Sequence, residues 1–177
     1  MIAPRGGTGG YWIRPALGKD VTAILGLIAP YARQGLMLPR SEGEIRAGMA
    51  ELLVATRPNG EVVGCGGLRL YPDDTAEIVS LAVAPTERGR GLGGRLVARL
   101  RRRSQALGVG RTFALTLDPD FFEGRGFQVA ARSDFPEKEA ADCRVCPRRG
   151  SCREVAVVHV EVEARRSADL TSYMFRV

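Results

Sequence analysis

The stretch of sequence that decides the fold is residues 77–107, EIVSLAVAPTERGRGLGGRLVARLRRRSQAL. Its apolar run at residues 78–84 predicts a buried strand, and Pro85 ends that strand because proline has no N–H for a sheet ladder. An Arg/Gly loop at residues 88–94 then leads into a helical pattern of apolar residues: Leu92, Leu96, Val97, Leu100 and Leu107. At such a junction the unpaired N–H groups of the first helical turn and the positive end of the helix dipole face the loop. The stretch therefore predicts a binding site for a phosphate or pyrophosphate group.

Length and composition are those of a single globular domain. The chain has 177 residues, of which 45% are hydrophobic and 26% charged, and no apolar run approaches the length of a membrane span. We expect a flexible lead-in at residues 1–10, one domain at residues 11–163 and a tail at residues 164–177. Because the first ten residues, MIAPRGGTGG, lack the apolar core of a secretory signal, we expect a cytoplasmic protein that does not bind membranes.

The charge balance favours an anionic ligand without requiring a nucleic acid. The formal net charge is +6, and of the basic residues only Lys19 and Lys138 are lysines. A basic surface attracts polyanions, and a phosphorylated cofactor satisfies that attraction as well as a nucleic acid does. The basic segment CRVCPRRGSCR has no aromatic platform beside it, so we expect no nucleic-acid partner.

Local signals along the chain predict the order β-α-α-β-β-β-α-β-α-β-β. Asp20 is placed to cap the first helix, a capping box at Ser41 and Glu44 starts the second, and an Asn-Gly pair at Asn59 predicts a hairpin turn. The fold class is therefore α/β, with antiparallel strands in the first half and a parallel crossover after the central strand. The predicted elements are strands at residues 11–16, 52–56, 61–71, 77–84, 111–117, 127–131 and 154–162, and helices at residues 21–34, 42–50, 92–107 and 120–125.

The glycine loop itself fits neither of two common phosphate motifs. It has no Gly-Lys-Ser/Thr ending, and Gly91-x-Gly93 is followed three residues later by Leu96 instead of glycine. The pattern Arg-x-x-Gly-x-Gly at residues 88–93, eleven residues after Glu77, resembles the GCN5-related N-acetyltransferase (GNAT) superfamily. The resemblance implies a mixed central sheet flanked by helices, and acetyl-CoA as co-substrate. It further implies cofactor contacts from Leu81, Ala82, Val83, Arg88, Gly89, Arg90, Gly91, Leu92, Gly93 and Gly94.

Acyl transfer to an amine needs a neutral nitrogen, and an α-amino group is mostly protonated at neutral pH. Glu77 stands at the start of the central strand, where the resemblance implies a general base. The alternative is a strand glutamate without a catalytic role. Many GNAT enzymes have a tyrosine in the short late helix that protonates the departing thiolate, but here Phe122 stands there.

A narrower resemblance concerns the amine. The segment QGLMLPRS at residues 34–41, together with the late segment DCRVCP, resembles short members of the bacterial N-acetylglutamate synthases, which lack the amino-acid-kinase domain. The resemblance implies transfer from acetyl-CoA to L-glutamate, the first step of arginine biosynthesis. Glutamate needs cationic anchors for its carboxylates, and we expect Arg40, supported by Ser41, with Arg69 as a second. Long members carry a further arginine after the strand that ends in Leu-Thr, where this chain has Leu117-Asp118.

The four cysteines leave two interpretations open. Cys143, Cys146 and Cys152 could supply three thiolates to zinc, with His159 or Cys65 as a fourth ligand, or they could be free thiols. In its glycine-rich strand, Cys65 is better explained as a packed thiol than as a nucleophile.

Three functions are therefore consistent with the sequence. The leading one is N-acetylation of glutamate. The second is a GNAT enzyme acting on another small amine or a protein N-terminus, and the third is a non-catalytic module that binds CoA or an amino acid. A homo-oligomer is compatible with each of them.

Overall fold

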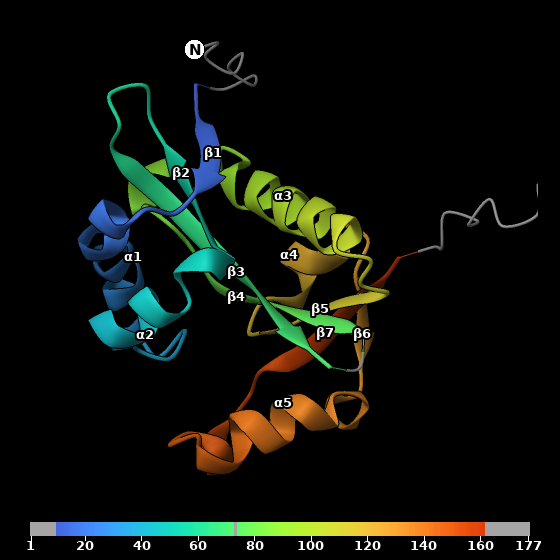
Figure 1. Ribbon diagram of the computed structural model, residues 1–177. Helices are drawn as coiled ribbons and strands as arrows, with labels where there is room; N and C mark the ends of the chain where they lie inside the picture. Colours follow the sequence, from blue (N-terminus) through green and yellow to red (C-terminus); the bar gives the residue numbers. More distant parts are fainter. Residues whose placement is uncertain (1–9, 73, 162–177) are drawn as a thin grey trace, which may run out of the picture.

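The centre of the molecule is a mixed β-sheet (Figure 1). The computed structural model describes residues 10–72 and 74–161, so most of the predicted lead-in and the whole predicted tail lie outside the described residues. Across the sheet the strand order is β1-β2-β3-β4-β5-β7-β6, and among these neighbours β4 and β5 pair in parallel while the others are antiparallel. The strands are β1 (Trp12–Pro15), β2 (Leu52–Thr56), β3 (Val62–Tyr71), β4 (Thr75–Val83), β5 (Arg111–Thr116), β6 (Gln128–Ala130) and β7 (Val155–Val160).

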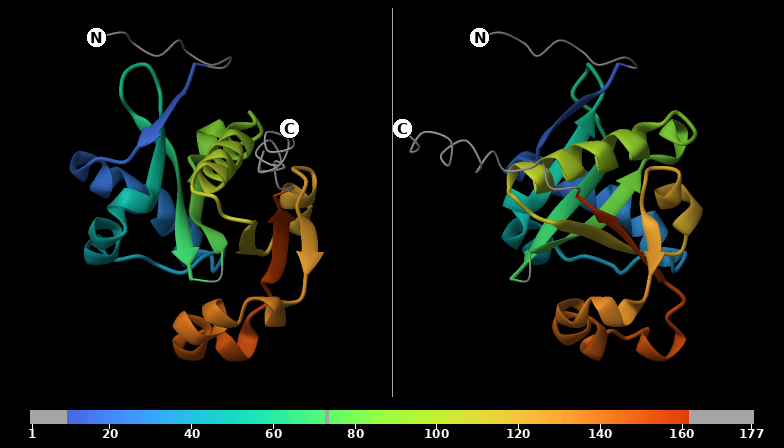
Figure 2. Two further views of the ribbon diagram at one scale, coloured as in Figure 1. Left: turned by 45° about the vertical axis from the view of Figure 1, so that its right-hand side comes forward. Right: turned by 90° about the vertical axis from the view of Figure 1, so that its right-hand side faces the viewer.

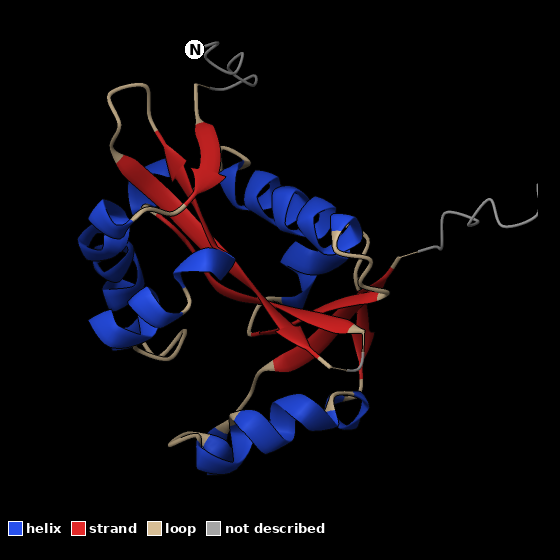
Figure 3. Ribbon diagram, viewed as in Figure 1, coloured by secondary structure: helices blue, strands red, loops and turns tan. Residues whose placement is uncertain are grey.

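Helices cover both faces of this sheet (Figure 3). The pair α1 (Val21–Arg33) and α2 (Glu42–Ala47) lies on one face, and α3 (Leu92–Ala106) with α4 (Pro119–Glu123) lies on the other. The predicted α/β class and its mixed sheet are confirmed. None of the helices in the described part of the chain is long and apolar enough to cross a lipid bilayer.

One helix was not predicted. The helix α5 (Pro136–Ala141) lies between β6 and β7, where the sequence pattern indicated only a polar loop. It sits away from the helices on the two faces, next to the loop that carries the cysteines (Figure 2). Its six residues contribute no buried side chain, so it lacks the apolar periodicity by which sequence reasoning finds a helix.

The capping signals located the other helices well. Ser41 caps α2 by accepting a hydrogen bond from the Glu44 backbone N–H, and the Glu44 carboxylate accepts from the Ser41 backbone N–H at 2.7 Å. This reciprocal pair is the predicted capping box. The helix ends at Ala47, three residues earlier than expected, because Gly48 follows as its C-cap.

The glycines of β3 are explained by the helix that packs on them. A Cβ atom on Gly64 would lie 3.1 Å from the Leu96 side chain, and one on Gly66 would lie 3.1 Å from the Leu100 side chain. Both leucines are fully buried on the inner side of α3. The missing side chains of β3 therefore let α3 lie close against the sheet, although glycine would otherwise weaken a strand.

The parallel pair β4 and β5 separates soon after it begins. The two strands pair at Thr75 with Arg111, at Ala76 with Thr112 and at Glu77 with Phe113, and no further. From Ile78 onward β4 stays with β3, while β5 stays with β7 along its whole length. The sheet therefore forks immediately after Glu77.

Two glycine substitutions test this packing in opposite directions. Gly66→Val should lower the free energy of unfolding by about 1–3 kcal/mol, because the new methyl groups overlap the Leu100 and Leu81 side chains. Gly26→Ala should raise it by about 0.5–1 kcal/mol, because Gly26 is exposed inside α1 with no atom within 4 Å of an added Cβ. Urea denaturation followed by circular dichroism measures both. Equal effects of the two substitutions would contradict the close approach of α3 to β3.

Candidate acyl-transfer site

A cleft of about 740 Å³ occupies the fork between β4 and β5. This volume lies within the range of about 300–1,000 Å³ that is typical of cofactor and ligand sites. One wall consists of Ile78, Leu81 and Val83 from β4, and the opposite wall of Ala114, Leu115 and Thr116 from β5. The mouth is formed by the Arg/Gly loop and the start of α3: Arg88, Gly89, Gly91, Leu92, Gly93 and Gly94.

Glycine is required at several points of this loop. Gly89 and Gly91 have φ angles of +73° and +76°, in the left-handed region that side chains disfavour. Gly91 is also the residue that caps α3. A Cβ on Gly94 would lie 2.6 Å from the Arg125 guanidinium, so the loop lies close against α4 and the residues after it. The backbone N–H groups at the start of α3 are thus left open to an anion in the cleft.

The two loop arginines have different positions. Arg88 lines the cleft, where its Nε donates to the Tyr31 hydroxyl at 3.1 Å and its guanidinium lies 4.7 Å from the centre of the Tyr31 ring. Arg90 does not line the cleft and instead points to Glu87, with an N–O distance of 3.5 Å. Glu87 is 2% exposed and is also bound by Tyr11 and Arg57. Arg90 therefore belongs to the contacts around Glu87 that hold the loop, and Glu87 itself lines the cleft.

Most of the residues predicted to bind a cofactor are found on the cleft. Leu81, Val83, Arg88 and the loop residues from Gly89 to Gly94 other than Arg90 line it. Ala82 is buried at 2% exposure and packs towards α1, as the alternation of a strand requires. Arg125 also lines the cleft and was missed by the sequence prediction.

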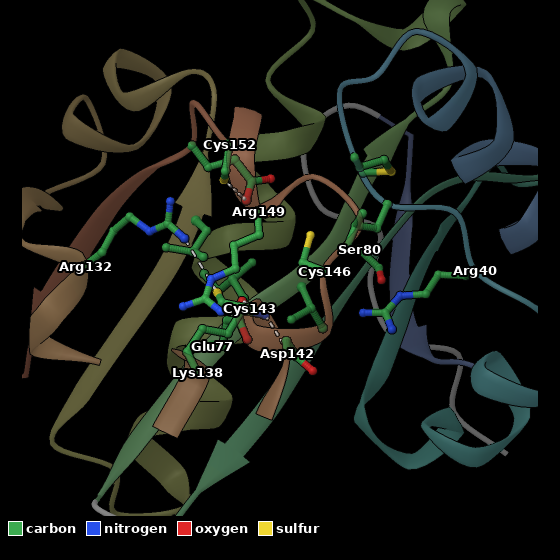
Figure 4. Close-up of a pocket in the computed structure, with 16 residues that line it drawn as sticks. Arg40, Glu77, Ser80, Arg132, Lys138, Asp142, Cys143, Cys146, Arg149 and Cys152 are labelled. Atoms are coloured by element: carbon green, nitrogen blue, oxygen red, sulfur yellow. Dashed lines mark hydrogen bonds and ion pairs between the residues drawn. The ribbon is translucent and has the colours of Figure 1, made fainter. Parts of the chain in front are cut away.

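A second, smaller cavity of about 120 Å³ adjoins the cleft (Figure 4). The two spaces share four lining residues: Met37, Ile78, Leu115 and Glu154. Glu77 lines only the smaller one. The cavity is too small for a cofactor of the size that the cleft accepts, so it suits a small second ligand.

A β-bulge in β4 separates the two spaces. Cys65 pairs with Ala82 and Gly67 with Val79, so two residues of β4, Ser80 and Leu81, face one residue of β3. Ser80 has a φ of +53°, which is unusual outside glycine and is typical of functional sites. As a result Ser80 lines the small cavity while its neighbour Leu81 lines the cleft.

Glu77 is held on both of its oxygens. Its carboxylate is 3% exposed, with Oε1 at 2.8 Å from Lys138 Nζ and Oε2 accepting a hydrogen bond of 2.8 Å from the Tyr71 hydroxyl. Burial, together with this carboxylate, raises the pKa of Tyr71, so the phenol stays protonated and donates. Glu77 therefore stands at the fork in a fixed orientation, with its remaining lone pairs available on the cavity side.

Lys138 connects Glu77 to the loop after α5. Its ammonium also lies 2.7 Å from Asp142, and Asp142 lies 2.6 Å from Arg69. Burial alone would lower the pKa of Lys138, but the two carboxylates outweigh it and raise that pKa above its ordinary value. Burial likewise favours a higher pKa for Asp142, yet Lys138 and Arg69 hold it below its usual range. Lys138, Asp142 and Arg69 are thus charged at neutral pH.

The three predicted substrate anchors differ in their positions and contacts. Arg40 lines the small cavity, 3.6 Å from Glu44. The Ser41 hydroxyl is used in the cap of α2. Arg69 does not line the cavity, because its guanidinium is paired with Asp142 and lies 5.4 Å from the centre of the Tyr71 ring. The cavity holds charged side chains that sequence reasoning missed: Arg132, Lys138, Asp142, Arg149 and Glu154.

The zinc interpretation of the cysteines is not supported. Cys143, Cys146 and Cys152 all line the small cavity, but in the described ranges no three His, Cys, Asp or Glu side chains are grouped to hold a metal ion. A guanidinium nitrogen of Arg132 lies 3.6 Å from the Cys143 sulfur. Its positive charge disfavours the binding of a metal ion at this sulfur.

The two suggested fourth ligands also lie elsewhere. His159 contacts the Gly126 carbonyl from β7, and Cys65 donates to the Ser80 carbonyl at 3.4 Å. Burial raises the pKa of the Cys65 thiol to about 12, which confirms a packed thiol and excludes a thiolate nucleophile at neutral pH.

The comparison with known sequences agrees with this geometry. Residues 20–127 match the family described as "Acetyltransferase (GNAT) family". The chain belongs to the GNAT acetyltransferases.

Two individual GNAT relatives are similar to this chain over most of its length. The chain is 36% identical over 146 residues to an uncharacterized N-acetyltransferase of Chlorobaculum tepidum, covering 82% of this chain and 94% of that protein. It is also 36% identical over 117 residues to an amino-acid acetyltransferase of Mycobacterium tuberculosis, covering 65% and 67%.

A solved GNAT structure is similar over most of the chain. N-acetylglutamate synthase from Neisseria gonorrhoeae, complexed with coenzyme A and N-acetyl-glutamate, superposes with a TM-score of 0.77 at 30% identity. The match covers 85% of this chain but only 35% of that protein, so this chain spans about a third of its length.

One side chain departs from the usual GNAT pattern. Phe122 is 5% exposed, and its ring packs edge-on against Phe121 and Phe127 at centroid distances of 5.1 Å and 5.2 Å. Phe122 is a core residue, and its side chain has no acidic proton to donate to a thiolate. Within the described part of the cleft, Tyr31 and Thr116 are the side chains with a hydroxyl group.

The different positions of Arg88 and Arg90 give a matched test of this GNAT cleft. Arg88→Ala should weaken the affinity for CoA about 5- to 30-fold, because a charge-assisted hydrogen bond to phosphate is lost. Arg90→Ala should change that affinity less than about threefold, because the Arg90 side chain does not line the cleft and is paired with Glu87. Isothermal titration calorimetry with CoA measures both. A larger loss for Arg90→Ala than for Arg88→Ala would place the pyrophosphate outside the cleft described here.

Proposed function

We propose that the protein transfers the acetyl group of acetyl-CoA to the α-amino group of L-glutamate, giving N-acetylglutamate and CoA. The observation that carries this proposal is the small cavity that adjoins the cleft through Met37, Ile78, Leu115 and Glu154. A large space that can hold the acyl donor thus lies directly beside a small, charged space that can hold the acceptor. The relatives named amino-acid acetyltransferase and N-acetylglutamate synthase support the same choice.

The direct reaction requires the acceptor nitrogen to meet the thioester at the junction of the two spaces. The nitrogen attacks the carbonyl carbon, the C–S bond breaks, and the nitrogen loses a proton while the thiolate gains one. We assign Glu77 as the general base, because it lines the acceptor cavity at the fork and its carboxylate is held in place by Lys138 and Tyr71. We assign the backbone of residues 81–83 to the pantetheine arm, since Leu81 and Val83 line the cleft.

The acceptor cavity favours an anionic amino acid. Arg40 faces it from the loop before α2, where it can bind a carboxylate of the substrate. With glutamate as substrate, the reaction is the first step of arginine biosynthesis, and we place the protein in the cytoplasm on that basis.

One assay separates this proposal from its alternatives. Purified protein is mixed with acetyl-CoA and each of the twenty amino acids in turn, and release of free thiol is followed. We expect release that depends on glutamate and saturates with it. Release with a different amine alone would replace glutamate as the substrate. Binding of CoA without turnover on any amine would indicate a regulatory module that has lost the chemistry.

A pair of isosteric substitutions tests the base. Glu77→Gln should lower kcat about 10²- to 10⁴-fold with little change in the affinity for CoA, because the amide keeps the shape but accepts no proton. Glu154→Gln is the matched variant, because Glu154 is the carboxylate at the junction of the two spaces. A large loss for Glu154→Gln with normal turnover in Glu77→Gln would transfer the role to Glu154. Thermal unfolding of both variants controls for folding.

A further inference from the structure

The charges around the acceptor cavity do not all compensate one another. Four cationic side chains line it, Arg40, Arg132, Lys138 and Arg149, against the three carboxylates Glu77, Asp142 and Glu154. An excess of positive charge in a small, partly closed space favours an anionic ligand. Which cation is available to that ligand depends on the partners that each one already has.

Three of the four cations have carboxylate partners in the protein. Lys138 is saturated by Glu77 and Asp142, at 2.8 Å and 2.7 Å. Arg149 is mostly exposed and pairs with Glu139 at 3.2 Å. Arg40 is paired loosely, with 3.6 Å to Glu44, so it retains donors for a ligand.

Arg132 differs from these three. Over residues 10–72 and 74–161 no Asp or Glu oxygen lies within 4.0 Å of its guanidinium, and its hydrogen-bonding neighbours are the sulfur atoms of Cys143 and Cys152. Thiols are weak acceptors and do not neutralise a cation. A half-buried guanidinium on a cavity wall without a carboxylate is costly unless a ligand supplies the negative charge.

The two available cations face each other across the cavity. Figure 4 shows Arg132 and Arg40 pointing into it from opposite sides, with Glu77 and Lys138 between them. The loop that carries Arg40 also reaches the cleft through Leu36 and Met37. Arg132 contacts Cys143, which lines the small cavity but not the cleft. Arg40 therefore lies on the loop that reaches the cleft, and Arg132 lies across the small cavity from it.

We propose that Arg132 binds the side-chain carboxylate of the amino-acid substrate, with Arg40 on its α-carboxylate. The inference rests on the proposed function and deepens it, because it names the residue that selects an acidic side chain. The fork of a guanidinium matches a carboxylate with two parallel hydrogen bonds, which a neutral amide cannot accept in the same way.

The test compares two acceptors of the same shape, glutamate and glutamine. Arg132→Met should raise the KM for glutamate about 10- to 100-fold, leave the KM for acetyl-CoA unchanged, and bring the ratio of kcat/KM for glutamate over glutamine close to one. Arg132→Lys should recover part of the loss, because it keeps the charge without the forked geometry. Arg144→Met is the matched control in the same loop, since Arg144 is exposed and does not line the cavity, and it should behave as the unmodified protein.

Two outcomes would overturn the assignment. One is an unchanged glutamate KM in a folded Arg132→Met variant, as judged by thermal unfolding. The other is an equal loss for glutamate and glutamine, which would move Arg132 to the α-carboxylate. A separate binding measurement keeps the test independent of turnover. Glutarate, a dicarboxylate of the same length without the amine, should bind the CoA-loaded protein and bind Arg132→Met at least tenfold more weakly.

The glutarate binding measurement also distinguishes failure of the proposed function from failure of the assignment of Arg132. If the unmodified protein does not acetylate glutamate, the proposed function fails, and weaker glutarate binding in Arg132→Met still supports the carboxylate site. If glutamate is acetylated but Arg132→Met is unaffected, the proposed function stands and the assignment of Arg132 is wrong. If glutarate does not bind the unmodified protein and glutamate is not acetylated, both are wrong.

Discussion

The site depends on one constraint, the separation of β4 and β5 directly after Glu77 and Phe113. Two parallel strands that paired along their full length would fill the space that the cleft occupies with backbone hydrogen bonds. Because β5 instead follows β7 and β4 follows β3, an opening with unpaired strand edges remains between them. The same fork places Glu77 at its apex and the Arg/Gly loop at its mouth, so one departure from regular pairing sets the distance between Glu77 and that loop.

A chain of charges then joins the acceptor side to this fork. Contacts of 2.6–2.8 Å link four side chains one to the next: Arg69 on β3, Asp142 after α5, Lys138 on α5 and Glu77 on β4. The Tyr71 hydroxyl is the second partner of the Glu77 carboxylate. Each carboxylate has a cationic partner, so partial burial of these charges is offset. The network orients the Glu77 carboxylate and at the same time attaches the cysteine-containing loop, so the position of Glu77 and the closure of the small cavity have a common cause.

How much the sequence could predict follows from the range over which each signal acts. The glycines of the Arg/Gly loop, the cap at Ser41 and the hairpin turn at Asn59 are consequences of local backbone preferences, and they were located to within a few residues. The pairing of Glu77 with Lys138 joins residues that are far apart in the chain, and no local rule connects them. Arg132 gave no signal either, because a lone arginine after a short strand is common on any surface. Arg69 was predicted as a second substrate anchor, and only the fold shows that it is paired with Asp142 and does not line the small cavity.

The absence of buried side chains in α5 has a consequence for how this architecture can change. The cofactor cleft is built from β4, β5 and α3, whose apolar residues form the core, so a substitution there also affects folding. In the outer wall of the small cavity, α5 has no buried side chain and is held by the ion pairs of Lys138, whereas Phe135 just before it is buried and stacks on Phe113 at 4.1 Å. Replacements of the exposed residues of α5 therefore alter this wall at small cost to the fold, while Phe135 and Lys138 keep the wall attached to the sheet. The cleft is thus lined by residues on which folding depends, whereas part of the wall of the small cavity can vary with little effect on folding.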